Sequence, residues 1–215
     1  MNFEKEIPLI AILRGIKFEE VLEHVSILAE EGFQYVEIPL NSPNWEKSIP
    51  LVIQHYGNKL NVGAGTVLNK QHVEKLARMN AKIIVTPNIN VSVIKSTLEN
   101  NMEIYPGCAT ATEAFTAIDA GARNLKIFPT APLGVNYIKS LMSVLPKEVS
   151  IYAVGGITPQ NLHEYLRIGC YGAGLGNDLY RIGQTPEKTR ENARAFISAY
   201  IAFKNQNYWF EEILK

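Results

Sequence analysis

Short apolar runs rich in β-branched residues recur along the chain, with starts 21 to 27 residues apart. Each run has the length of one buried strand. The spacing leaves room for a strand, a loop and a helix of about three turns, so the pattern predicts eight consecutive βα units. The runs begin at Pro8, Tyr35, Asn61, Lys82, Glu103, Asn124, Ile151 and Gly172.

The segments between these runs carry helix signals. Between residues 18 and 31, apolar side chains recur at helical spacing, as at Val21 and Val25. Thr110 and Glu113 have the spacing of a capping box, in which each side chain bonds the backbone N–H of the other residue. These signals predict a helix after each strand.

Parallel strands that are joined by helices either close into a barrel or spread into a doubly wound sheet. Eight units of similar length favour a single-domain (β/α)8 TIM barrel. No GxGxxG turn follows the first run, which argues against a dinucleotide-binding sheet. We expect the barrel to span residues 1–205. Residues 206–215 would form an aromatic tail that packs, through Tyr208, Trp209 and Phe210, on the barrel or on a neighbouring subunit.

The charge balance and the cysteine content of the chain limit the kinds of partner that we expect. The chain has 21 basic and 21 acidic residues, so it offers no excess charge for nucleic acid or an anionic membrane. Its two cysteines, Cys108 and Cys170, have neither disulfide-framework nor zinc-site spacing. The first six residues include two glutamates and lack the apolar h-region of a signal peptide, and no apolar run approaches membrane-spanning length. We therefore expect a cytoplasmic protein that binds a small molecule.

Lys126 lies inside the apolar run at residues 125–129. Removing an ammonium group from water costs several kcal/mol unless the group is paired or loses its proton. Because burial disfavours the charged form, such a lysine can supply a neutral, nucleophilic amine. The alternatives are a side chain that reaches solvent from an edge strand and a structural ion pair.

Two further charged residues can share the interior with Lys126. Strand alternation permits a register in which Arg14, Glu37 and Lys126 all point inward, although alternation alone does not fix it. Chemistry in this architecture gathers at the carboxyl ends of the strands. A buried ion pair remains possible, but three charged residues on inner strands exceed what packing needs and favour a catalytic role.

Glycine pairs follow the last two strands. Gly155 and Gly156 end the seventh run, and Gly174 and Gly176, followed by Asn177, end the eighth. The loops after these strands commonly bind phosphate through backbone N–H groups, which suits a chain without surplus positive charge. After the third run, small residues precede Thr66, which offers a hydroxyl group.

Metal ligands do not converge in the predicted barrel. The histidines all fall in predicted helices, and Glu37 is the sole acid on an inner-strand face. A metal-dependent aldolase or epimerase needs several ligands at one point. We therefore expect neither a metal site nor a cofactor. The histidines are His24, His55, His72 and His163.

From about Pro8 to Tyr180, the chain resembles the KDPG/KHG aldolase family of class I aldolases. The resemblance is carried by the segments LKIFP, VEIPL, GAGTV and GGI. It implies that Lys126 forms a Schiff base with the substrate and that Glu37 moves protons. It also implies a homotrimer without a cofactor, a substrate-facing Thr66, and phosphate binding by Gly155, Gly156, Gly176 and Asn177.

Two details resemble the galactonate branch of this family. LIAILRG and EIPLNSP match that branch, and Asn41 stands where some relatives place an arginine, which leaves Arg14 as the anchor for the substrate carboxylate. Val154 replaces a threonine that is typical of gluconate-type members. The branch implies cleavage of 2-keto-3-deoxy-6-phosphogalactonate to pyruvate and glyceraldehyde 3-phosphate, in galactonate catabolism.

Three alternatives stay open. The substrate could be the gluconate isomer or 4-hydroxy-2-oxoglutarate. The barrel could be a sugar-phosphate isomerase or epimerase that forms no covalent intermediate, with Lys126 acting only through its charge. A catalytically silent phosphate-binding barrel would use the glycine loops alone.

Overall fold

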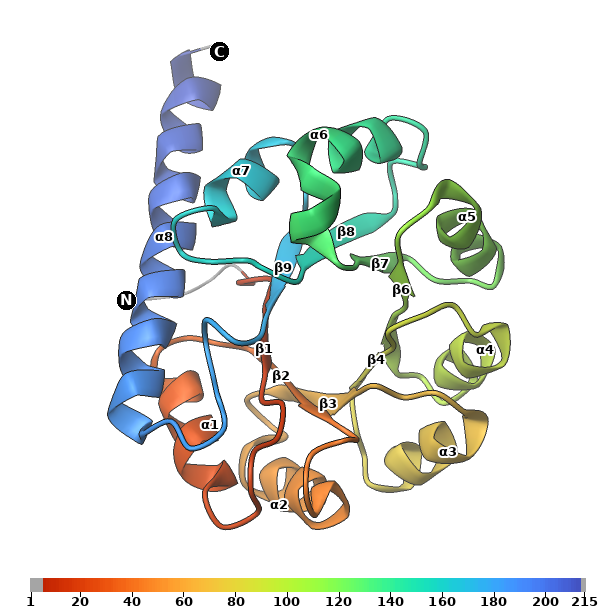
Figure 1. Cartoon of the computed structure of the whole chain (residues 1–215), viewed down its shortest axis with the longest axis vertical. Coiled ribbons are helices and arrows are strands. Elements are labelled where there is room, and N and C mark those ends of the chain that lie inside the picture. The colour runs from red at the N-terminus through yellow and green to blue at the C-terminus, as the bar shows by residue number, and fades with distance from the viewer. Residues whose placement is uncertain (1–5, 214–215) are drawn as a thin grey trace.

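The structure, a computed structural model, describes residues 6–213. Parallel strands form a central barrel, and the helices surround it (Figure 1). The strands are β1 (Leu9–Ile12), β2 (Tyr35–Pro39), β3 (Asn61–Gly65), β4 (Ile83–Val85), β5 (Glu103–Tyr105), β6 (Gly107–Cys108), β7 (Asn124–Ile127), β8 (Ser150–Val154) and β9 (Gly172–Leu175). The single-domain (β/α)8 barrel that the sequence predicted is therefore confirmed.

The barrel closes at Pro106. Strand β5 pairs with β4, β6 pairs with β7, and only Pro106 separates β5 from β6. The Pro106 carbonyl accepts a hydrogen bond from the Lys126 N–H at 3.0 Å. Because proline has no N–H to donate, it interrupts the ladder at this point. β5 and β6 together thus make one barrel strand, and all eight strands begin within one residue of their predicted starts.

The helices follow the strands in turn around the outside of the barrel (Figure 1). The predicted capping box forms, since the Glu113 N–H donates to Thr110 Oγ1 at 3.3 Å and the Thr110 N–H donates to Glu113 Oε2 at 3.0 Å. The helices are α1 (Val21–Glu30), α2 (Trp45–Tyr56), α3 (Lys70–Arg78), α4 (Val91–Glu99), α5 (Ala111–Asp119), α6 (Thr130–Met142), α7 (Leu162–Arg167) and α8 (Pro186–Ile213).

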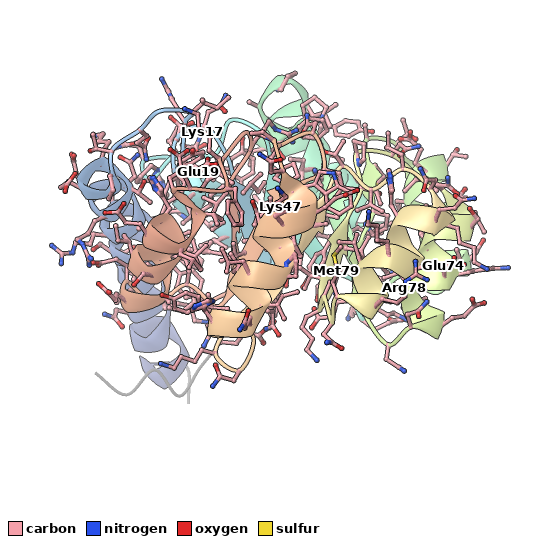
Figure 2. All side chains as sticks on the ribbon, turned by 90° about the horizontal axis from the view of Figure 1, so that it is seen from below. Lys17, Glu19, Lys47, Glu74, Arg78 and Met79 are labelled. Atoms are coloured by element: carbon pink, nitrogen blue, oxygen red, sulfur yellow. The ribbon has the colours of Figure 1, made fainter. Side chains whose placement is uncertain are left out.

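The barrel has one end at which all strands finish. Figure 2 shows the molecule from the side, with Lys17 and Glu19 at the upper edge and Met79 farther down. Lys17 and Glu19 follow β1, whereas Met79 follows α3 and precedes β4. The upper edge is therefore the face where the strands end, the face that carries the chemistry in barrels of this kind.

Two apolar clusters make the core. The larger cluster fills the space between the strands and the helices, and it includes Val36 and Ile38. The smaller one, here called the inner aromatic cluster, consists of Ile10, Tyr35, Ile83, Val85, Tyr105 and Tyr152. On β2, side chains thus alternate between the barrel interior and the helix layer. The interior is packed around a small cavity.

Helix α8 is longer than the other described helices and continues into the predicted tail as far as Ile213. Its first turns are tied to α1 by ion pairs from Glu31 to Arg190 at 2.8 Å and to Arg194 at 2.9 Å. Its last turns run beyond the barrel (Figure 1). The side chains of Tyr208, Trp209 and Phe210 lie outside the described part, so their packing stays a prediction. None of the described helices could cross a membrane.

Candidate active site

Lys126 from β7 and Glu37 from β2 both point into the barrel. The Lys126 side chain is 5% exposed and the Glu37 side chain 1%. The inward register that strand alternation permitted is therefore the observed one for these two residues. They line the cavity together with Ile10, Ile12, Val85, Tyr105, Tyr152, Val154 and Gly174.

Burial shifts both ionisable groups toward their neutral forms. Burial lowers the pKa of the Lys126 amine; the Glu37 carboxylate opposes this shift, and the Arg14 guanidinium adds to it. Burial likewise raises the pKa of Glu37, against the opposing effects of Lys126 and Arg14. A neutral amine beside a carboxyl group that can exchange a proton suits covalent chemistry at a carbonyl carbon.

Lys126 and Glu37 do not form a closed ion pair. No salt bridge joins them among the described residues, and Glu37 Oε2 is buried with no hydrogen-bond partner in that part of the chain. An unpartnered buried oxygen costs about 1–3 kcal/mol. The sequence left two other interpretations of Lys126 open, a side chain that reaches solvent and a member of a structural ion pair. Neither one matches this arrangement.

Phe128 covers one side of the Lys126 amine. Its ring centroid lies 4.8 Å from Lys126 Nζ, and the side chain is 38% exposed. Phe128 follows Lys126 by two residues, so strand alternation places both on the same side of the chain. Apart from that spacing, no feature of the sequence indicated this contact. An apolar ring here reduces the contact of the amine with water.

Gly65 provides the space for the Glu37 carboxyl group. A Cβ atom on Gly65 would lie only 1.5 Å from Glu37 Oε1. The two residues meet because β2 and β3 are paired, with Glu37 opposite Gly63 and Pro39 opposite Gly65. The small residues that precede Thr66 therefore leave room for the carboxyl group at this position.

Arg14 lies at the mouth of the barrel rather than in its interior. β1 ends at Ile12, and the Arg14 side chain is exposed, which corrects the prediction that all three charged side chains are enclosed. Arg14 Nη1 donates to Asn41 Oδ1 at 2.9 Å and to Thr66 Oγ1 at 3.5 Å. Thr66 has a φ of 58°, a conformation that residues other than glycine rarely adopt. Two predicted substrate-binding residues, Arg14 and Thr66, thus lie together.

The two glycine loops also lie side by side. β8 and β9 are paired, with Val154 opposite Gly174, so the loops that follow them are neighbours. Within the described residues, no hydrogen bond is donated by the backbone N–H groups of Gly156, Gly176 or Asn177. Free N–H groups on adjacent loops are the donors that an anion requires.

Val154 and Gly155 link these loops to the cavity. Val154 is buried and lines the cavity beside Lys126. Gly155 and Gly156 have φ values of 98° and 80°, in the left-handed region that glycine adopts without strain. The Gly155 carbonyl accepts a hydrogen bond from the Ala131 N–H at 3.0 Å, which ties this loop to the start of α6.

Thr86, which directly follows β4, hydrogen-bonds to the backbone. Thr86 Oγ1 donates to the Asn88 carbonyl at 2.6 Å and accepts from the Gly107 N–H at 3.3 Å. Thr86 therefore stabilises a turn. Across residues 6–213, no group of three or more His, Cys, Asp or Glu side chains is arranged to hold a metal ion.

The family model described as KDPG and KHG aldolase matches residues 1–190 of this chain. The chain belongs to the KDPG and KHG aldolase family. As a member it is an aldolase, a carbon–carbon lyase, and the resemblance drawn from its motifs is confirmed.

Individual relatives agree with this membership. The 2-dehydro-3-deoxy-6-phosphogalactonate aldolase of Escherichia coli (strain K12) is 54% identical over 200 residues, which are 93% of this aldolase and 98% of the relative. The solved structure described as "Native KDPGal structure" superposes with a TM-score of 0.92 at 53% identity, over 95% of this chain and 100% of that chain. A chain of a cube-shaped cage designed by fusing symmetric oligomeric domains has a TM-score of 0.95 and 52% identity, over 97% of this chain and 77% of its own.

Proposed function

We propose that this aldolase cleaves 2-dehydro-3-deoxy-6-phosphogalactonate to pyruvate and D-glyceraldehyde 3-phosphate through a Schiff base on Lys126. The observation that carries the proposal is the buried Lys126 amine beside the buried Glu37 carboxyl group. The substrate follows from the 54% identical relative of that name. The chain covers nearly all of that relative, so the two are similar across the whole barrel.

The reaction begins with attack of the neutral Lys126 amine on the C2 carbonyl carbon. A C–N bond forms, and the carbonyl oxygen takes up a proton to give a carbinolamine. Glu37, directly or through one water molecule, delivers the proton with which the hydroxyl group leaves as water. The product is an iminium ion, which serves as an electron sink.

Cleavage then uses Glu37 as a general base. Its carboxylate takes the proton of the C4 hydroxyl group, the C3–C4 bond breaks, and the bonding electrons move to C3 and into the iminium ion. Glyceraldehyde 3-phosphate leaves, and an enamine remains on Lys126. Protonated Glu37 returns its proton to C3, and water hydrolyses the resulting imine to release pyruvate.

The remaining predicted residues would hold the two charged ends of the substrate. Arg14 at the mouth would bind the carboxylate, for which a guanidinium group is well shaped, and Thr66 would offer its hydroxyl group. The N–H groups of Gly156, Gly176 and Asn177, with Gly155, would bind the phosphate. Binding the remote phosphate positions the C3–C4 bond over Lys126.

Reductive trapping tests this function. Borohydride added in the presence of pyruvate should fix a stable mass on the peptide that contains Lys126, and Lys126→Met should abolish the label. A sugar-phosphate isomerase or epimerase without a covalent intermediate would give no label. A label on another lysine, or none, would refute the proposed chemistry.

The stereochemical preference needs its own test. We expect faster cleavage of the galactonate-derived substrate than of its gluconate isomer or of 4-hydroxy-2-oxoglutarate. Val154 supports this expectation because it stands where gluconate-type members typically have a threonine. It also lines the cavity next to Lys126, where it can contact the substrate. Initial rates on the three substrates decide the matter, and equal or faster cleavage of the gluconate isomer would contradict the assignment.

We further propose that the aldolase is a homotrimer. The cage chain of 52% identity, which comes from a design that fuses symmetric oligomeric domains, supports an oligomer, and the family resemblance implies that the number of subunits is three. Sedimentation equilibrium should give three times the mass of the 24.0 kDa chain, and a mass of one or two chains would contradict the trimer. A cytoplasmic location and a place in galactonate catabolism remain predictions.

A further inference from the structure

The turn that follows β9, residues 176–180 and here called the β9 turn, carries two of the free N–H groups. The Gly176 carbonyl accepts hydrogen bonds from the N–H groups of Leu179 and Tyr180, each at 2.9 Å. A Cβ atom on Gly176 would meet no atom within 4 Å, so the space beside it is open. Because one side of the turn is open, contacts from its other side must fix its orientation.

Two side-chain amides meet on one backbone oxygen of this turn. The Leu179 carbonyl accepts from Gln184 Nε2 at 2.9 Å and from Asn192 Nδ2 at 3.1 Å. A carbonyl oxygen has two lone pairs, so the two amides use its full capacity. Gln184 precedes α8 and Asn192 lies in its second turn, so the end of the β9 turn is held by the start of this helix.

The Gln184 amide is itself anchored in the core. Its nitrogen also donates to Thr189 Oγ1 at 2.9 Å, and this fully buried hydroxyl group lies 2.8 Å from His24 Nδ1 on α1. The Tyr180 hydroxyl donates to Glu20 Oε1 at 2.9 Å, and the Tyr180 ring packs edge-on against His24 at 5.1 Å. Buried, mutually satisfied hydrogen bonds of this kind make a rigid support.

We propose that Gln184 and Asn192 are positioning residues for the phosphate group of the substrate. By fixing the Leu179 carbonyl, they keep the N–H groups of Gly176 and Asn177 directed at the phosphate. This inference rests on the proposed function, since it assumes a phosphorylated substrate at the β9 turn. Neither amide lines the cavity around Lys126, so we expect their removal to affect binding of the phosphate and not the chemistry at Lys126.

The test compares two acceptors in the synthetic direction. Pyruvate is added to D-glyceraldehyde 3-phosphate and to unphosphorylated D-glyceraldehyde by the wild type and by the double variant Gln184→Met/Asn192→Leu, which keeps side-chain size but loses both donors. We expect KM for the phosphorylated acceptor to rise about tenfold or more, because small displacements of binding groups have large effects. The kcat for this acceptor and the kcat/KM for D-glyceraldehyde should stay near the wild-type values.

Trapping of pyruvate by borohydride provides the internal control. Pyruvate carries no phosphate, so the double variant should be labelled at Lys126 as fully as the wild type. Gln54→Met on α2 and Ser198→Ala on α8 change exposed residues and should leave the preference for the phosphorylated acceptor unchanged.

An equal loss of rate with both acceptors, or an unchanged preference, overturns the inference. If the wild type itself shows no preference for the phosphorylated acceptor, the phosphate assignment of the proposed function fails first. Should the double variant not fold, Asn192→Leu alone is measured in the same way, because it leaves both hydrogen bonds of Gln184 in place. It should reduce the same preference to a smaller degree, and an unchanged preference again overturns the inference.

Discussion

Two groups of polar side chains share the barrel interior, and their surroundings differ. In the inner aromatic cluster, the Tyr35 hydroxyl donates to Glu6 and the Tyr105 hydroxyl donates to Glu103 Oε2 at 2.6 Å. Beside this cluster, Glu37 Oε2 has no partner within the described residues. Buried polar groups that serve stability are normally hydrogen-bonded, so an unpartnered one needs another explanation. We infer from this comparison that Tyr35 and Tyr105 stabilise the barrel and that Lys126 and Glu37 are free to take part in the proposed reaction.

Lys126→Met should have the largest effect on the rate and should show most clearly that the Lys126–Glu37 pair differs in role from the inner aromatic cluster. Turnover should fall below detection because no amine remains to form the imine. The free energy of unfolding should stay level or increase, because an apolar side chain replaces a buried amine. Denaturant titration and steady-state rates check both statements. Lys139→Met, at an exposed position on α6, should leave the rate unchanged, whereas a fully active Lys126→Met would remove Lys126 from the mechanism.

Glu37→Gln should have the next largest effect. The amide keeps the shape of the side chain but cannot accept the C4 hydroxyl proton, so kcat should fall by about a hundredfold or more. Glu103→Gln makes the same change beside the inner aromatic cluster and should alter stability more than rate. Single-turnover cleavage rates of the two variants test the contrast. Equal losses of rate would mean that Glu37 has no special part in proton transfer.

Gly65→Ala should act on the rate through Glu37. The new Cβ atom would lie 1.5 Å from Glu37 Oε1, so the carboxyl group must move. We expect kcat to fall by about tenfold to a hundredfold, because moving a catalytic group by about 1 Å is enough to slow a reaction to this extent. In a double-mutant cycle, Gly65→Ala should add little to Glu37→Gln. Additive losses would show that Gly65 acts independently of Glu37.

Tyr35→Phe should give the smallest effect. Removing the hydroxyl group breaks its hydrogen bond to Glu6 and should reduce the free energy of unfolding by about 1 kcal/mol. Because Tyr35 does not line the cavity, kcat should stay at the wild-type value. Chemical denaturation and steady-state kinetics decide this. A large loss of rate with unchanged stability would reverse the roles assigned to the two groups.

Much of this architecture follows from local sequence patterns. Regularly spaced apolar runs located the strands, because the strand of each βα unit is buried and therefore needs a short run of apolar residues. Alternation permitted an inward register for Glu37 and Lys126 without fixing it, and the structure has that register because both residues lie within regular strands. Alternation failed for Arg14 because β1 ends at Ile12, before that residue.

Contacts between distant segments could not be predicted in the same way. The fit of Glu37 against Gly65 depends on the register of β2 against β3, which no single run specifies. The hydrogen bonds of Gln184 and Asn192 to Leu179 join the start of α8 to a backbone oxygen in another loop. The closure at Pro106 depends on how β5 and β6 pair with different neighbours.

The proposed mechanism requires that burial make Lys126 a neutral nucleophile, and the pH dependence of reductive trapping measures this property. Pyruvate and borohydride are applied over a pH series, and the label on Lys126 is quantified by peptide mass. We predict a midpoint well below the ordinary lysine value of about 10.4. In Glu37→Gln the midpoint should fall further, because the carboxylate that raises the pKa of Lys126 is gone. A midpoint near the ordinary lysine value, unmoved by Glu37→Gln, would contradict the account.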